Sequence, residues 1–218
     1  MDIQKLEAQI RCVIYDCDGV LFDSLEANGR LYNDICTRLG RPPLTEEELG
    51  YVHSHTVFES IRCLAGGDKG LEMKAGEFLK QIDWKDYIQY LKMEPNLLQA
   101  LRMLKEKGMF RAINTNRSTS MKHIMERYDL WPYFDMVVTA LDVKNPKPHP
   151  ESVEKILSAL KLNKDEIIFV GDSEVDRQTA ESAGVRFIAY KNREISNGLL
   201  IEDHLELLEI VRNGKSPR

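Results

Sequence analysis

The sequence lacks a long hydrophobic run, and it has few cysteines and no excess of basic residues. No apolar stretch approaches the roughly 20 residues that a membrane-spanning helix needs, so we expect no membrane association. The first ten residues, Met1–Ile10, include Asp2, Lys5 and Glu7 and no apolar stretch, which argues against a signal peptide. A formal net charge of -5 also makes nucleic acids and anionic membrane surfaces poor candidate partners.

The four cysteines, Cys12, Cys17, Cys36 and Cys63, all lie in the first third of the chain. Their spacing matches no zinc-binding pattern, so we expect free thiols and a cytoplasmic protein. Hydrophobic residues make up 43% of the chain and charged residues 30%. This composition can fill a buried core and is typical of a globular protein, not a disordered one.

Five short apolar runs have the length and bounds of buried strands. In chain order they are residues 11–15, 110–114, 136–139, 167–170 and 186–189. Segments with helical spacing of apolar residues lie between them, at 97–107, 118–128, 152–160 and 174–183. This alternation predicts an α/β fold: a Rossmann-like, doubly wound parallel sheet covered by helices on both faces.

The alternation is interrupted once, because residues 24–92 contain helical patterns but no convincing strand. Leu31, Ile35 and Leu39 share one face of a predicted helix, which Gly40 is suited to end. Further helical patterns lie at 57–64, 71–82 and 84–91.

This helical insert predicts a second, smaller domain. We assign residues 23–94 to an inserted α-helical cap and residues 1–22 and 95–218 to the core. Within the insert, Thr45 and Glu48 have the spacing of a capping box, which predicts the start of a helix.

Polar residues follow the predicted strands at the edge where open parallel sheets bind ligands. In strand order they are Asp16 and Asp18, Thr115 and Asn116, Lys147, and Asp172 with Asp176. Clustered carboxylates repel one another unless a cation joins them, and a hard-oxygen site suits Mg²⁺ better than zinc. A lysine and a hydroxyl beside such a cation suit a phosphoryl group.

Four segments carry a resemblance to a known family. The runs VIYDCDGVLFDS, INTN, the lysine of KPHP, and FVGDSEVD resemble the four motifs of the haloacid dehalogenase superfamily in order and spacing. The resemblance spans nearly the whole chain, and the insert is similar to the family's first cap class, as in phosphoglycolate phosphatase-like enzymes. It implies a Mg²⁺-dependent phosphatase that hydrolyses a small phosphate monoester through an aspartyl-phosphate intermediate.

The resemblance also implies roles for the four aspartates. Asp16 would be the nucleophile and a magnesium ligand, and Asp18 would be the general acid and base, with its backbone carbonyl on magnesium. Asp172 would bind magnesium directly, and Asp176 would support the metal site. A general acid works best with its pKa raised toward the working pH, so we expect a raised pKa at Asp18.

The remaining candidates would contact substrate. By resemblance, Thr115, the Asn116 backbone amide and Lys147 would hold the phosphate. Arg117 flanks the second motif and is a candidate substrate contact, with a solvated helix start as the alternative. His53, one of two neighbouring cap histidines, is also a candidate contact, with an ordinary surface histidine as the alternative.

Three other functions stay open at this point. A phosphomutase of the same family would need basic residues around the cap glycine for a second phosphate, and Leu49 beside Gly50 argues against it. A 2-haloacid dehalogenase would lack the second aspartate, whereas Asp18 is present. A phospho-acceptor signalling domain would be shorter and without the insert. The sequence leaves the substrate and the oligomeric state open.

Overall fold

The computed structural model describes residues 10–212. The expectation that the first residues form no signal peptide falls on residues 1–9, which lie outside the described residues. Residues 213–218 at the other end of the predicted core also lie outside them. Among residues 10–212, no helix combines the length and the apolar character needed to cross a membrane.

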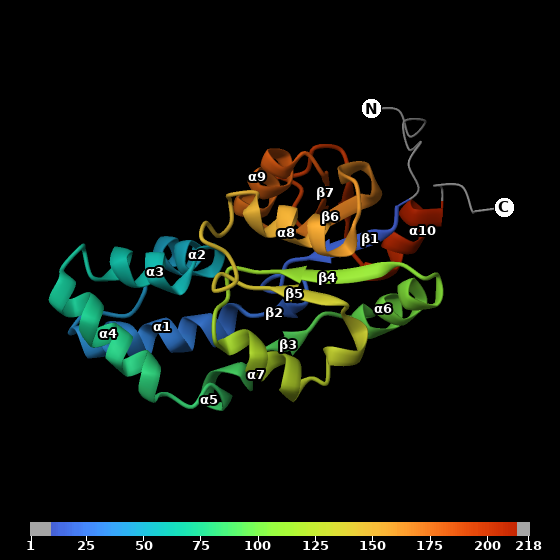
Figure 1. The fold of residues 1–218 in the computed structure, drawn as a ribbon. Helices are drawn as coiled ribbons and strands as arrows, with labels where there is room; N and C mark the ends of the chain where they lie inside the picture. Colours follow the sequence, from blue (N-terminus) through green and yellow to red (C-terminus); the bar gives the residue numbers. More distant parts are fainter. Residues whose placement is uncertain (1–9, 213–218) are drawn as a thin grey trace.

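A six-stranded parallel sheet forms the centre of the molecule (Figure 1). Its strand order is β5–β4–β1–β6–β7–β8, with parallel pairing throughout. The strands are β1 Cys12–Tyr15, β4 Phe110–Asn114, β5 Met136–Val138, β6 Ile167–Gly171, β7 Arg186–Tyr190 and β8 Leu200–Ile201. The chain builds outward from β1 first through β4 and β5 and then through β6 to β8, so the strand order reverses at β1. Ligands of such sheets bind at this reversal point.

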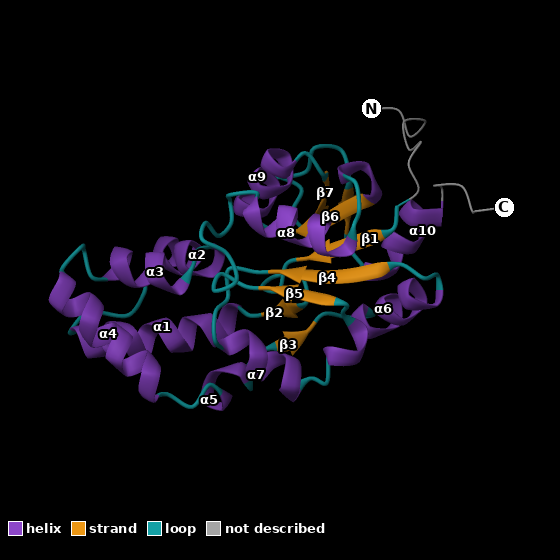
Figure 2. Cartoon of the chain, in the orientation of Figure 1, coloured by secondary structure: helices purple, strands orange, loops and turns teal. Residues whose placement is uncertain are grey.

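Helices cover both faces of the sheet (Figure 2). Val13 and Tyr15 point to one face and Cys12 and Ile14 to the other, as period-two alternation requires. The first face packs on α6 Leu97–Glu106, α7 Ser120–Arg127 and α10 Leu207–Arg212; the second packs on α8 Glu151–Leu160 and α9 Glu174–Ala183. The predicted doubly wound α/β fold is confirmed.

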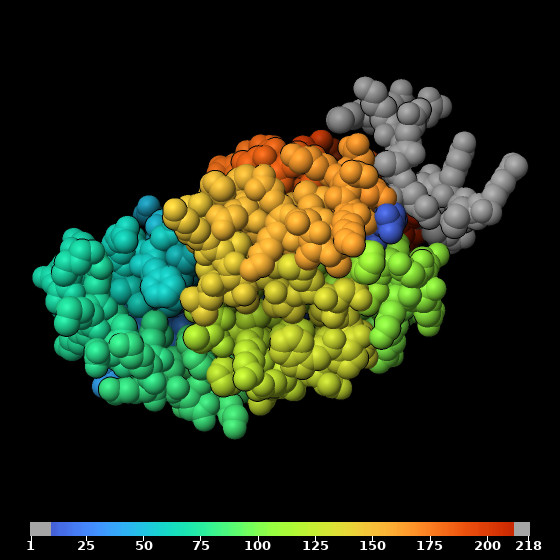
Figure 3. Space-filling view, in the orientation of Figure 1, coloured from blue at the N-terminus to red at the C-terminus, as the bar shows by residue number. Residues whose placement is uncertain are grey.

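The predicted helical insert forms one end of the molecule, coloured blue to teal in Figure 3. It contains α1 Leu25–Leu39, α2 Glu46–Ser54, α3 Val57–Leu64, α4 Lys69–Gln81 and α5 Lys85–Ile88. Gly40 ends α1 in the left-handed conformation, with φ 73°, and the capping box of Thr45 and Glu48 starts α2. These helices pack around their own buried cluster, which includes Leu31, Ile35 and Leu64. The cluster supports the predicted division, whose boundaries at residues 23 and 94 stay a prediction.

Two short strands join the insert to the core, and neither was predicted from the sequence. β2 Phe22–Asp23 and β3 Lys92–Met93 pair antiparallel, with Phe22 opposite Met93. A two-residue strand is too short to show alternation, which is also why β8 was missed. Single 3-10 turns complete the fold at Trp131–Tyr133, Lys164–Glu166 and His204–Glu206.

His204 is buried between the sheet and the loop that follows β1. Its ring stacks on Tyr190, with centroids 4.6 Å apart, and its Nε2 donates a hydrogen bond to the carbonyl oxygen of Val20 at 2.9 Å. Burial lowers the pKa of His204 to about 4. The folded protein therefore holds this ring in its neutral form.

This neutral histidine predicts acid sensitivity. Between its ordinary pKa near 6.5 and about 4, the unfolded chain binds a proton at His204 and the folded chain does not. We expect the free energy of unfolding to fall by up to about 3 kcal/mol as the pH drops through this window. Urea unfolding at about pH 7 and about pH 4.5 measures the change.

The comparison uses His204→Phe, which keeps an aromatic ring but cannot titrate. We expect it to show a smaller loss of stability on acidification than the wild type, whereas substitution of the exposed His149 by glutamine leaves the pH dependence unchanged. An equal pH dependence in His204→Phe and the wild type would contradict this account.

Candidate active site

The predicted site residues converge at the carboxyl edge of the sheet, around the end of β1. Asp16 and Asp18 follow β1, whereas Asp172 follows β6 and Asp176 lies in the first turn of α9. One small cavity, with about 40 Å³ of free space, lies between this edge and the insert. Its lining includes Asp16, Asp18, His53, Thr115, Asn116, Arg117 and Lys147.

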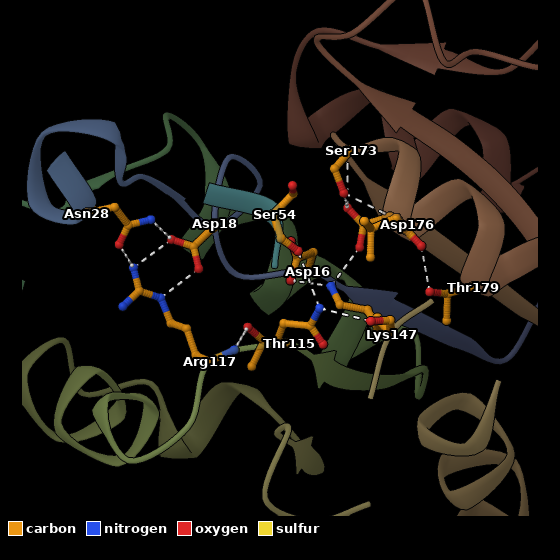
Figure 4. Close-up of polar contacts among 12 residues, drawn as sticks. Asp16, Asp18, Asn28, Ser54, Thr115, Arg117, Lys147, Ser173, Asp176 and Thr179 are labelled. Atoms are coloured by element: carbon orange, nitrogen blue, oxygen red, sulfur yellow. Dashed lines mark hydrogen bonds and ion pairs between the residues drawn. The ribbon is translucent and has the colours of Figure 1, made fainter. Parts of the chain in front are cut away.

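Lys147 is a buried cation between two carboxylates. Its Nζ lies 2.8 Å from Oδ1 of Asp16 and 2.6 Å from Oδ1 of Asp176 (Figure 4). Asp176 is fixed further by Ser173, whose hydroxyl donates to Oδ2 at 2.6 Å and caps α9. The start of α9 therefore sets the position of Lys147, although Lys147 itself comes from the loop after β5.

Three carboxylates lie close enough to share one cation. Asp16, Asp172 and Asp176 each offer an oxygen, and these oxygens lie within 4.8 Å of one another. Burial raises the pKa of Asp16 to about 7, and repulsion by Asp176 adds to it, against the charge of Lys147. Burial and the same repulsion raise the pKa of Asp172 well above its usual range. An all-oxygen group with excess negative charge fits Mg²⁺.

The backbone directly after Asp18 approaches the side chain of Asp172 very closely. Gly19 has φ +71°, and a Cβ placed there would lie 1.9 Å from Oδ2 of Asp172. Only glycine combines this conformation with this close approach. Gly19 thereby lets the segment carrying Asp18 lie against the carboxylate group.

Asp18 is held by a forked ion pair. Arg117 donates from Nε to Oδ2 at 2.7 Å and from Nη2 to Oδ1 at 2.6 Å, and Asn28 donates to Oδ1 at 3.1 Å. Burial raises the pKa of Asp18, but the charges of Arg117 and His53 lower it to about 2. The expectation of a raised pKa at Asp18 is therefore wrong for this arrangement, because the carboxylate has a partner 99 residues away.

Arg117 is not a solvated residue at a helix start. Its side chain is 11% exposed, and Nη2 also donates to Oδ1 of Asn28 at 3.1 Å. Asn28 in turn contacts Nδ1 of His53 at 3.2 Å, so both insert residues reach the site. Sequence reasoning missed Asn28; the available signal was a polar side chain on the same face of α1 as Leu31.

The second-motif residues lie between these two ion pairs. The Thr115 hydroxyl accepts a hydrogen bond from the Arg117 backbone N–H at 3.1 Å. The Asn116 side chain donates to the carbonyl oxygen of Lys147 at 3.1 Å and to that of Ser54 at 3.3 Å. Asn116 therefore ties the core loops to the end of α2 in the insert.

Comparisons with known proteins agree with this geometry. Residues 13–190 match the family model described as haloacid dehalogenase-like hydrolase. A Rhodobacter capsulatus protein named phosphoglycolate phosphatase is 28% identical, covering 82% of this chain and 83% of its own. A Thermotoga maritima protein named phosphorylated carbohydrates phosphatase is 29% identical, covering 82% and 84%.

A solved structure is also similar. A haloacid dehalogenase-superfamily hydrolase of subfamily IA, variant 1, from Geobacter sulfurreducens is 39% identical, with a TM-score of 0.79. The match covers 92% of this chain and 99% of that one. With its sheet, its four motif loops and a family match over most of its length, the chain belongs to the haloacid dehalogenase-like hydrolase family.

Proposed function

We propose that this chain is a magnesium-dependent phosphatase that hydrolyses a small phosphate monoester through an aspartyl-phosphate. The observation that carries the proposal is the position of Asp16, which lies beside Lys147 and within the carboxylate group of Asp172 and Asp176. A nucleophile between a fixed cation and a metal site suits attack on a phosphoryl group.

The proposed reaction has two displacements. A carboxylate oxygen of Asp16 attacks phosphorus, the bond to the ester oxygen breaks, and Asp18, which must first take up a proton, passes that proton to the departing oxygen. Asp18 then accepts a proton from water, whose oxygen attacks the phosphorus of the aspartyl-phosphate and restores Asp16. The alcohol and inorganic phosphate are the products.

The surrounding residues would stabilise the charge that builds up during both displacements. Lys147 would bind the phosphoryl oxygens, helped by the Thr115 hydroxyl and the Asn116 backbone amide. Asp16, Asp172 and the Asp18 backbone carbonyl would hold Mg²⁺, with Asp176 supporting them from behind. The ion would neutralise charge between the nucleophile and the phosphoryl group.

Two further expectations belong to this proposal. The names of the relatives support a small phosphorylated metabolite as substrate, and His53 from the insert would contact it. Free cysteines, three of them buried, support a reducing compartment such as the cytoplasm.

The test is phosphate release from a panel of small phosphate monoesters in the presence of MgCl₂. We expect several turnovers per enzyme molecule and stoichiometric alcohol and phosphate. An isomeric phosphate ester without free phosphate would identify a phosphomutase instead, and a single turnover that leaves the protein phosphorylated would identify a phospho-acceptor domain.

A further inference from the structure

His204 is a fully buried histidine that makes one hydrogen bond, to the turn that follows β1. Its ring packs against the rings of Tyr190 and Tyr15, with centroids 4.6 Å and 5.9 Å away. Among residues 10–212, its Nε2 has one partner, the carbonyl oxygen of Val20 at 2.9 Å, and its Nδ1 has none. Burying this polar ring costs stability that an apolar ring would not cost. The hydrogen bond to Val20 is therefore what a histidine supplies here and a phenylalanine would not.

Val20 lies in the tight turn of residues 17–22, which also carries Asp18. The turn closes through two backbone hydrogen bonds to the carbonyl oxygen of Cys17, at 3.0 and 3.1 Å. Val20 is itself buried, and in the described part of the chain no backbone N–H donates to its carbonyl oxygen. His204 supplies that donor, so the turn is held from inside the core as well as by its own backbone.

The turn sets the position of the Asp18 backbone, and it has little room to move on one side. Gly19 lies so close to Asp172 that a Cβ would be 1.9 Å from the carboxylate oxygen Oδ2. Loss of the donor at His204 would leave a buried carbonyl unpaired, which is unfavourable enough to make the turn shift. Asp18 would shift with it, and a displacement of about 1 Å in a reacting group can lower a rate by about 100-fold.

We propose that His204 is a positioning residue, which places Asp18 for proton transfer by holding the Val20 carbonyl. The inference rests on the proposed phosphatase function. His204 is not among the residues that line the cavity, so it acts on the reaction through the turn. Proton transfer matters most for a poor leaving group, because an alcohol leaves protonated whereas a nitrophenol leaves easily as its anion. A misplaced Asp18 should therefore slow the cleavage of alkyl esters more than that of aryl esters.

The experiment compares p-nitrobenzyl phosphate, whose leaving group is an alcohol, with p-nitrophenyl phosphate, whose leaving group is a phenol. Both are assayed with the full chain and MgCl₂. In His204→Phe, which keeps the ring but has no donor, kcat/KM for the alkyl ester relative to the aryl ester should fall by about tenfold or more. His204→Gln, whose side-chain amide can donate from nearly the position of Nε2, should keep a ratio close to that of the wild type.

The ratio between two esters cancels any difference in the amount of folded enzyme. Phe187→Leu, which removes packing on the opposite face of the sheet, is the control for a loss of stability alone and should leave the ratio unchanged. If His204→Phe does not fold, His204→Met gives the same comparison, because methionine has the length of glutamine without its donor.

Equal losses for both esters in the variants without a donor would overturn the inference, because His204 would then only stabilise the fold. A ratio in His204→Gln as low as that in His204→Phe would also overturn it, since the hydrogen bond would then not be the cause. Failure of the wild type to release phosphate from either ester, or from any other monoester, would instead overturn the phosphatase function itself.

Discussion

Substitution of Asp16 by asparagine is expected to lower kcat for phosphate release by at least about 10⁴-fold. The amide oxygen carries no negative charge, so it attacks phosphorus poorly, and no aspartyl-phosphate accumulates. The amide has nearly the shape of the carboxylate, and Lys147 keeps its ion pair with Asp176. We therefore expect the variant to fold normally.

The measurement combines steady-state phosphate release with acid-quenched detection of phosphorylated protein. Both signals should disappear in Asp16→Asn, while the thermal unfolding midpoint stays close to that of the wild type. Asp165→Asn is the control for replacing a carboxylate by an amide. Asp165 is exposed and lies just before the first residue of β6, at the edge of the sheet away from the site. Near-normal phosphate release by Asp16→Asn would show that another residue is the nucleophile.

Removal of divalent metal is expected to lower activity by at least about 10³-fold, since no divalent charge would then stabilise the ionised nucleophile and the phosphoryl group. Mg²⁺ should also stabilise the folded protein, because the group of Asp16, Asp172 and Asp176 forms only on folding. At a concentration about 100 times the Kd, the stabilisation amounts to about 2.7 kcal/mol. Thermal unfolding with and without MgCl₂ measures it independently of turnover.

Asp172→Asn provides the matched variant for the metal prediction. It removes one charge from the group while the Lys147 ion pairs with Asp16 and Asp176 persist. We expect weaker stabilisation by Mg²⁺ and a higher MgCl₂ requirement for turnover. Full activity after thorough chelation would contradict a metal role for these carboxylates.

The core of the fold could be predicted because its signals are local. Each main strand is a short apolar run, and each helix between these strands has an apolar face, so periodicity alone located them to within a residue or two. The last helix, α10 Leu207–Arg212, was not predicted. Capping residues such as Gly40 and Thr45 fixed the helix ends in the same way. The short strands β2, β3 and β8 have two residues each, too few for any period to appear.

The composition of the site was predictable, but its pairings were not. The carboxyl ends of parallel strands meet at one edge of the sheet, so the sequence could predict that Asp16, Thr115 and Lys147 lie near one another. Which cation faces which carboxylate depends on side-chain geometry. Asp18 pairs with Arg117, which is 99 residues away in the sequence, and this contact lowers the pKa of Asp18. A pattern of neighbouring residues cannot predict such a pairing.

The chain leaves the core and returns to it at adjacent, hydrogen-bonded points, Phe22–Asp23 and Lys92–Met93. We therefore expect that the segment between those points could be replaced without changing the strand order of the sheet. A hybrid protein with this core and the insert of another family member would keep the core's reaction. The other family member would supply the residues at the positions of Asn28 and His53. Selectivity could in this way evolve, or be engineered, separately from the chemistry.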